Sequence, residues 1–384
     1  MNHILVSILW IALVNSLPGL NHSRFNLDQS FIANQSAALK NEISGLHKPD
    51  SIKIGLIIEK EDELGIMAIR GAEMAVEEAN INDGYNGNPF HIIIRDCEGP
   101  WGRTSKEVAN LVYEDEVTVI MASLDGRNAH LTEQVTTKTH IPLVSTRATE
   151  ATLTQAFIPW YFRSVPSDKQ QIQVLYKEIF LNRGFRRVGI IKSENYEDQQ
   201  TAYEFNKYIA AQGLPSIKTT IIQYTDDNFE NDLQQFNDSE IEAIIIFMGR
   251  TFSEELIQTT RKKGIKTMIY TDLSFTSNRP DSEKIRFISP VGWYEKQGDD
   301  FKKQYYNRYG QQPGLAAAYA YDGMNLIMRA ITIAGPEKEA IKEELSRIVY
   351  CDGITGCINF DKNGNKQELP VVMEIRNGKP EIIE

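Results

Sequence analysis

Residues 145–154, Ser-Thr-Arg-Ala-Thr-Glu-Ala-Thr-Leu-Thr, place small and hydroxyl-bearing side chains directly after an apolar strand expected over 141–144. If a helix begins here, its first turn presents backbone N–H groups without partners inside the helix, with hydroxyls beside them. That arrangement binds a carboxylate or another small anion without a basic side chain. The alternative is an ordinary capping turn, in which Thr146 or Thr149 caps the helix and nothing is bound.

Further candidate contacts lie in loops that follow strands, where open α/β sheets bind their ligands. These loops cover residues 59–64, 123–128, 145–149, 192–196, 249–252 and 271–274. The last three supply Tyr196, Phe252 and Asp272, so an acid that suits an ammonium group lies near aromatic rings. Surface or core aromatics and a helix-capping Asp272 are the alternatives. A ligand bearing both charges, an amino acid, would fit between the two sets of loops.

The local patterns of common catalytic and cofactor sites are missing. The sequence contains no Walker A loop and no Gly-x-Gly-x-x-Gly, His-Glu-x-x-His, Cys-x-x-Cys or Gly-x-Ser-x-Gly pattern. Its 6 histidines lack the spacing of metal ligands. We therefore expect no enzymatic activity, no metal and no cofactor.

The elements that must position these loops alternate between strand and helix, which predicts parallel sheets covered on both faces. Strands are expected over 52–58, 90–94, 117–121, 141–144, 187–191, 219–222, 243–247 and 267–270, and closing strands over 357–360 and 370–375. The pattern restarts after Pro166, so this chain of 384 residues is predicted to form two α/β domains of similar layout.

The net charge of the chain and its N-terminal sequence indicate which partners and which cellular compartment to expect. A formal net charge of −11 gives nucleic-acid binding no electrostatic basis. The apolar run over 4–14 predicts a signal peptide at residues 1–22, with an uncleaved anchor as the alternative, and residues 23–50 are predicted to be a polar tether. No cysteine follows the run, which excludes bacterial lipoprotein processing. We expect a periplasmic or extracellular protein.

Three cysteines are too few for a disulfide framework. Cys351 and Cys357 flank a short loop, and either a local bridge or two buried free thiols is compatible with this spacing. Cys97 is left unpaired.

Several strings, taken together in their order and spacing, resemble the branched-chain amino acid (Leu/Ile/Val-binding) family of type I periplasmic binding proteins. They are IKIG at 52–55, RGAEMAVEEAN at 70–80, DCE at 96–98, IPLVS at 141–145 with Ala148 and Thr149, AYAYDG at 318–323, GITG at 353–356 and FDKNG at 360–364. The resemblance covers residues 52–384.

The resemblance implies two Rossmann-like lobes with parallel central sheets, joined by three crossovers and closing on a small ligand. On this chain, lobe 1 is expected at 52–165 plus 294–350, and lobe 2 at 166–293 plus 351–384. A Cys97 partner is also implied by the family, but its position is Asp125 here, so that disulfide is absent.

The resemblance also implies site residues. The ligand α-carboxylate is expected to meet the backbone at Arg147 and the N–H and hydroxyl of Thr149, beside Ala148. Gly126 stands where the family often has a serine, and Ser123 or Asn128 is the expected replacement donor. The second lobe is expected to supply Tyr196, Phe252 and Asp272, and the carboxylate of Asp272 is expected to bind the ammonium group of the ligand.

Arg147 departs from the family, which usually has a small residue there. A guanidinium is always charged and suits bidentate recognition of oxyanions. We therefore expect a ligand with more negative charge than a branched-chain amino acid, such as an acidic or dicarboxylic amino acid, unless Arg147 points away from the ligand.

These observations predict a monomeric, secreted solute-binding protein that captures an amino acid or related carboxylate and delivers it to a membrane ABC permease. The alternative is a sensory module of the same fold that reports the ligand to a partner protein.

Overall fold

The computed structural model describes residues 51–99, 102–213, 218–223, 233, 236, 240–248, 250–273, 275 and 285–383, with only the backbone at 218–223 and 250–255. The signal peptide predicted at 1–22 and the tether predicted at 23–50 lie outside the described residues. Within the described part, no helix is both long and apolar enough to span a membrane.

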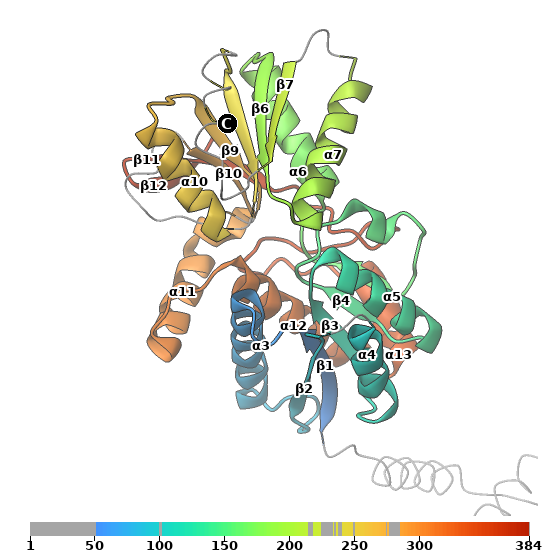
Figure 1. Ribbon diagram of the computed structural model, residues 1–384. Helices are drawn as coiled ribbons and strands as arrows, with labels where there is room; N and C mark the ends of the chain where they lie inside the picture. Colours follow the sequence, from blue (N-terminus) through green and yellow to red (C-terminus); the bar gives the residue numbers. More distant parts are fainter. Residues whose placement is uncertain are drawn as a thin grey trace, which may run out of the picture. The chain divides into compact units, whose positions relative to one another are not determined.

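The first of two sheets has five parallel strands in the order β2-β1-β3-β4-β5 (Figure 1). Its strands are β1 (Ile52–Ile58), β2 (Phe90–Asp96), β3 (Val119–Ser123), β4 (Leu143–Ser145) and β5 (Tyr161–Arg163). One face packs on α3 (Glu63–Ile81), α12 (Leu315–Ala334) and α13 (Lys338–Arg347), and the other on α4 (Arg103–Tyr113) and α5 (Gly126–Thr139). Alternate residues of β1 serve the two faces, as the two-residue period of a strand requires.

The second sheet has the order β12-β11-β10-β9-β8-β6-β7. Its strands are β6 (Arg187–Lys192), β7 (Lys218–Gln223), β8 (Ala243–Phe247), β9 (Met268–Thr271), β10 (Ile285–Ser289), β11 (Val371–Arg376) and β12 (Lys379–Ile382). Five strands are parallel, and β11 and β12 add an antiparallel edge. The helices α6 (Asp168–Tyr176) and α7 (Tyr196–Ala211) pack on one face, while α10 (Arg250–Lys262) packs on the other. The fold is therefore two parallel-sheet α/β lobes, as predicted.

The chain passes between the two sheets three times: after β5, between β10 and α12, and between α13 and β11 (Figure 1). The second passage contains α11 (Lys296–Tyr309), whose Arg308 forms an ion pair with Glu77 of α3. In the third passage, Asn365 forms a bridge with Arg163 at the end of β5. The exact lobe boundaries predicted from the sequence stay a prediction.

Close packing explains part of the RGAEMAVEEAN string. A Cβ at Gly71 would lie 2.1 Å from the carbonyl oxygen of Ala317, so only glycine lets α3 and α12 approach this closely. The two helices then bury a shared apolar seam under the first sheet.

Three elements differ from the sequence prediction. The helix expected to begin in residues 145–154 is only the short 3₁₀ helix η2 (Ala151–Thr154), because Phe157 has a positive φ of 46° and Pro159 follows. The strand expected at 357–360 is reduced to isolated bridges, and the antiparallel β12 was not expected. Helix α6 is followed directly by a π-helical turn over Lys177–Asn182.

Candidate functional site

The N-terminal turns of α5 and α7 meet, one from each lobe. Each helix begins just after a strand and is capped by the side chain before it: Asp125 accepts from Asn128 N at 2.7 Å, and Asn195 accepts from Glu197 N at 3.3 Å. Across the lobes, the N–H of Gly126 donates to Glu197 Oε1 at 2.8 Å. The loops at the carboxyl ends of β3 and β6 are therefore in contact, as strand-end loops of an α/β protein should be for a shared site.

Tyr196 adds a second contact between the same two turns. The guanidinium carbon of Arg127 lies 4.2 Å from the centre of the Tyr196 ring, a cation–π geometry. The Tyr196 hydroxyl also interacts with the carboxylate of Glu150. The predicted site residues Gly126 and Tyr196 are thus brought together.

Glu150 is buried beside Gly126, with its Oε1 3.6 Å from Nε2 of His130. Hydrogen bonds with Glu133 and Glu150 raise the pKa of His130 to about 9, so this imidazole is cationic at neutral pH. Burial alone would raise the pKa of Glu150, but His130 and Thr152 outweigh burial and hold that pKa below its ordinary value. Glu150 is therefore an anion at neutral pH.

Arg147 is half-buried and already paired with two acids. Its Nη1 lies 3.2 Å from Glu59 Oε2 and 3.1 Å from Asp62 Oδ2. Burial raises the pKa of Glu59 even with this partner. The charge of Arg147 is thus offset within the first lobe, although its field still reaches Glu197.

Thr149 also contacts an acid of the chain. Its hydroxyl hydrogen-bonds the carboxylate of Asp168, and its carbonyl accepts the N–H of Asp168 at 2.8 Å. Asp168 is the first residue of α6 and is buried, which raises its pKa. The hydroxyl expected to bind a ligand carboxylate is therefore bound to a carboxylate of the protein in this structure.

The other predicted site residues do not contact the turns of α5 and α7 in a way that assigns them a role. Ser123 is fully buried at the end of β3, and its hydroxyl has no hydrogen-bond partner among the residues that the structure describes. Ala148 is fully buried in the apolar cluster beneath α4 and α5. Asp272 is half-buried after β9, and the side chain of Phe252 lies outside the described residues, so their roles stay predictions.

Three acids at the meeting point were missed by the sequence prediction. We call Glu150, Asp168 and Glu197 the interlobe acids; each interacts with a residue that the sequence had singled out. Two of them, Asp168 and Glu197, occupy the first turn of a helix, where acidic residues are common for reasons of helix electrostatics alone. That signal was visible in the sequence but did not distinguish a site from a helix start.

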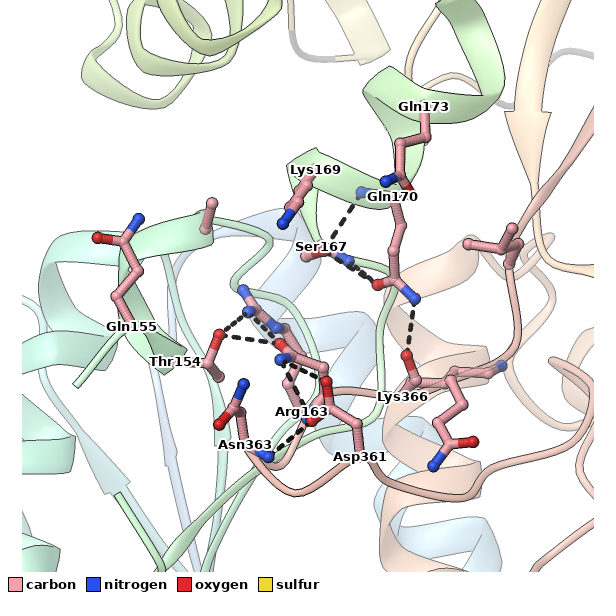
Figure 2. A pocket seen from close by; sticks show the side chains of 14 residues that line it. Thr154, Gln155, Arg163, Ser167, Lys169, Gln170, Gln173, Asp361, Asn363 and Lys366 are labelled. Carbon is pink, nitrogen blue, oxygen red and sulfur yellow. Dashed lines mark hydrogen bonds between the residues drawn. The ribbon is translucent and has the colours of Figure 1, made fainter. Parts of the chain in front are cut away.

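A polar pocket of about 490 Å³ lies elsewhere, where the chain passes between the lobes after β5 (Figure 2). Arg163, fully buried, donates to the carbonyl of Glu150 at 2.6 Å, to Asn365 Oδ1 at 2.6 Å and to Thr154 Oγ1 at 3.0 Å. Gln170 of α6 donates to the carbonyl of Lys366 at 2.7 Å. We call Thr154, Arg163, Gln170 and Asn365 the hinge cluster; its bonds tie the first passage to the third.

The GITG string forms a loop anchored to the buried Asp322 of α12. The Asp322 carboxylate accepts the N–H groups of Ile354 at 2.9 Å and Thr355 at 2.8 Å. Burial raises the pKa of Asp322 to about 6. A disulfide joins Cys351 to Cys357 across this loop, which decides between the two alternatives left open by the sequence.

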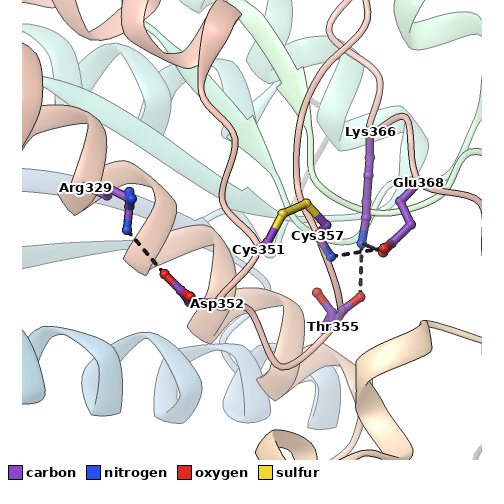
Figure 3. The surroundings of a disulfide bond; sticks show 7 residues. All are labelled: Arg329, Cys351, Asp352, Thr355, Cys357, Lys366 and Glu368. Carbon is purple, nitrogen blue, oxygen red and sulfur yellow. Dashed lines mark hydrogen bonds and ion pairs between the residues drawn. A yellow bond between two sulfur atoms is a disulfide. The ribbon is translucent and has the colours of Figure 1, made fainter.

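Lys366 also contacts this loop (Figure 3). Its Nζ donates to the carbonyl of Thr355 at 3.1 Å and pairs with Glu368 at 3.3 Å.

Cys97 is a buried free thiol, and burial raises its pKa to about 12, so it is not a nucleophile at neutral pH. In the described part of the chain, no group of three or more His, Cys, Asp or Glu is placed to hold a metal ion.

A family model described as "Periplasmic binding protein" matches residues 51–379. Among solved structures, the branched-chain amino acid transporter substrate-binding protein LivJ from Streptococcus pneumoniae, in complex with isoleucine, superposes with a TM-score of 0.72 at 22% identity, covering 87% of this chain and 99% of that one. A solute-binding protein of an ABC transporter from Rhodopseudomonas palustris, in complex with benzoate, gives 0.72 at 15% identity, with 87% and 95% covered. Such identities establish a shared fold.

Plant receptors are also similar in sequence. Glutamate receptor 2.9 of Arabidopsis thaliana is 21% identical over 230 residues, which are 58% of this chain and 23% of the receptor. Glutamate receptor 3.4 of the same plant is 24% identical over 187 residues, which are 48% of this chain and 18% of the receptor. The chain thus spans about a fifth of the length of these relatives.

Proposed function

Because the chain belongs to the periplasmic binding protein family, we propose that it is an extracytoplasmic solute-binding protein that captures a small polar ligand and delivers it to a membrane ABC transporter. The ligand class is an amino acid or a related carboxylate. We also propose that the protein is a monomer and that it catalyses no reaction.

One observation carries the proposal: the first turns of α5 and α7, at the carboxyl ends of strands in different lobes, contact each other through Gly126 and Glu197. Two lobes joined by three chain passages can close on a ligand at such a point and exclude water. Closure strengthens each charge-assisted hydrogen bond to the ligand, because the effective dielectric constant falls.

A ligand screen tests the capture step. The melting temperature of the purified protein is measured with leucine, glutamate, benzoate and other small carboxylates. A ligand of this site raises the melting temperature progressively with its concentration, since it binds only the folded state. If no small carboxylate or amino acid shifts the transition, the proposed ligand class is wrong.

Transport and sensing are separated by uptake. Cells lacking the protein should lose high-affinity uptake of the radiolabelled ligand and recover it when the gene is restored. The second candidate, a ligand-sensing module, is favoured by the similarity to plant glutamate receptors. Unchanged uptake together with a lost response to the ligand supports that candidate instead.

Export is tested by deleting residues 1–22. The apolar run at 4–14 predicts that the shortened protein stays in the cytoplasm, whereas the full-length chain is exported. Full-length protein found in the cytosol with Met1 retained would contradict export.

A further inference from the structure

We propose that Glu197 is an internal competitor of the ligand, whose carboxylate occupies the N–H of Gly126 at the start of α5 until a ligand carboxylate displaces it. This inference rests on the proposed function, because it concerns the same pair of facing loops. It assigns to Glu197 the role of a residue that sets affinity for carboxylate ligands.

The start of α5 offers few donors, which makes the competition direct. Asp125 already accepts the N–H of Asn128, so Gly126 supplies the N–H that reaches the other lobe. A side chain at Gly126 could add a donor only by displacing the Glu150 carboxylate, because a Cβ there would lie 2.3 Å from Glu150 Oε2. A carboxylate that approaches Gly126 must therefore take the position that Glu197 Oε1 holds at 2.8 Å.

The second predicted carboxylate donor shows the same arrangement. The Thr149 hydroxyl is bound by Asp168, so two donors of the first lobe hold two carboxylates from helices of the second. Both acids lie in the first turn of a helix, and a helix N-terminus stabilises a nearby negative charge. The protein thus places its own carboxyl groups where the sequence predicted the carboxylate of a ligand.

The charges around Glu197 make this internal anion easy to displace. Arg147 favours its ionised form, whereas Asp125, Asp168 and Asp198 oppose it. Burial is the largest influence, and it raises the pKa of Glu197 to about 7. A ligand that frees Glu197 to face water relieves this unfavourable burial, which offsets part of the cost of breaking the bond.

Calorimetry on three forms of the full-length protein tests the proposal: wild type, Glu197→Ala, and the control Glu204→Ala. Glu204 lies on the same helix and pairs with Lys207 at 3.1 Å, so its loss removes the same charge without touching Gly126. The probes are leucine and glutamate, with leucinamide as the counterpart that lacks the α-carboxylate. All titrations are run at one salt concentration and at about pH 8, where Glu197 is mostly ionised because its pKa is about 7.

We expect Glu197→Ala to bind leucine or glutamate at least about tenfold more tightly than wild type, since one charge-assisted hydrogen bond no longer has to be exchanged. Leucinamide should bind all three forms alike, and Glu204→Ala should match wild type. If Glu197→Ala binds the amino acids no better than wild type, or more weakly, Glu197 does not compete and the proposal is overturned.

Amide hydrogen exchange supplies a readout that needs no ligand. The Gly126 N–H should exchange at least about tenfold faster in Glu197→Ala than in Glu204→Ala, because its acceptor is gone. Equal exchange rates overturn the proposal. Faster exchange without binding of any probe supports the internal contact and counts against the proposed function alone.

Discussion

The hinge cluster and the interlobe acids both contain buried charge between the lobes, but they hold it in opposite ways. Arg163 is surrounded by oxygen atoms from three segments, and both of its terminal nitrogens donate hydrogen bonds. Glu197 and Asp168 each bind a donor of the other lobe, yet burial and neighbouring acids raise their pKa values. Arg163 is held by acceptors that belong to the fold, although its Nε has no partner among the described residues, whereas Glu197 and Asp168 bind donors that the proposed ligand carboxylate would also use.

The largest expected effect is at Arg163, whose replacement would break the first half of this comparison. Arg163→Met leaves Glu150 O, Thr154 and Asn365 without their shared donor in a buried position. We expect the free energy of unfolding to fall by about 3–5 kcal/mol in denaturant titration, because each buried acceptor left unpaired costs about 1–3 kcal/mol.

Arg329→Met is the matched control for Arg163→Met. Arg329 is an exposed arginine that pairs with Asp352 at 3.4 Å, so its loss should cost no more than about 1 kcal/mol. Equal losses of unfolding free energy in the two variants would show that the buried hydrogen bonds of Arg163 stabilise the protein no more than an exposed ion pair does.

The next effect in size concerns Asp322, a buried acid outside the proposed ligand site whose carboxylate accepts hydrogen bonds from the GITG loop. Asp322→Ala removes the acceptor of two backbone N–H groups in the GITG loop. We expect a loss of about 2–3 kcal/mol in the free energy of unfolding at pH 7, because buried donors are left without partners. A loss below about 0.5 kcal/mol would mean that water replaces the carboxylate.

The pH dependence of stability sharpens the second half of the comparison. The pKa of Glu197 in the folded state is raised to about 7 from an ordinary 4.5, so the folded protein holds this proton more tightly than the unfolded chain does. Its contribution to stability is therefore present below about pH 4.5 and is lost as the pH rises toward 7.

Glu197→Gln removes that titration while keeping an oxygen that accepts the Gly126 N–H. Between pH 4.5 and pH 7, wild type should lose stability relative to Glu197→Gln, measured by thermal unfolding at several pH values. A constant difference between the two proteins over this range would contradict the unfavourable burial of Glu197.

The smallest expected effect on stability is at Arg147. Because its guanidinium is half-buried between Glu59 and Asp62, Arg147→Ala should lower the free energy of unfolding by only about 1 kcal/mol. The same variant tests the ligand expectation from the sequence: glutamate binding should weaken by more than about tenfold. Tight leucine binding that the substitution leaves unchanged would show that Arg147 serves its two acids and not the ligand.

Much of the site's framework could be predicted because it depends on local patterns. Strand-end loops place Gly126 and Tyr196, and these two positions do lie in the contacting turns of α5 and α7. The carboxylate partners could not be predicted, since Glu197 lies 71 residues from Gly126 in the sequence and looks like an ordinary first-turn acid. The helix expected within residues 145–154 failed for a local reason, the break at Phe157 and Pro159.

The sequence by itself determined the two α/β lobes, because the alternation of apolar strands and amphipathic helices is a short-range property that survives without knowledge of contacts. It also determined the family, through the order and spacing of its strings. Only the tertiary structure decided which charges meet: Glu197 with Gly126, Asp168 with Thr149, and Arg147 with Glu59 and Asp62. The physical reason is that ionic and hydrogen-bond partners are set by distance in space, which the sequence does not give. The chain contains many acidic residues, so the sequence alone does not show which of them reaches a given donor.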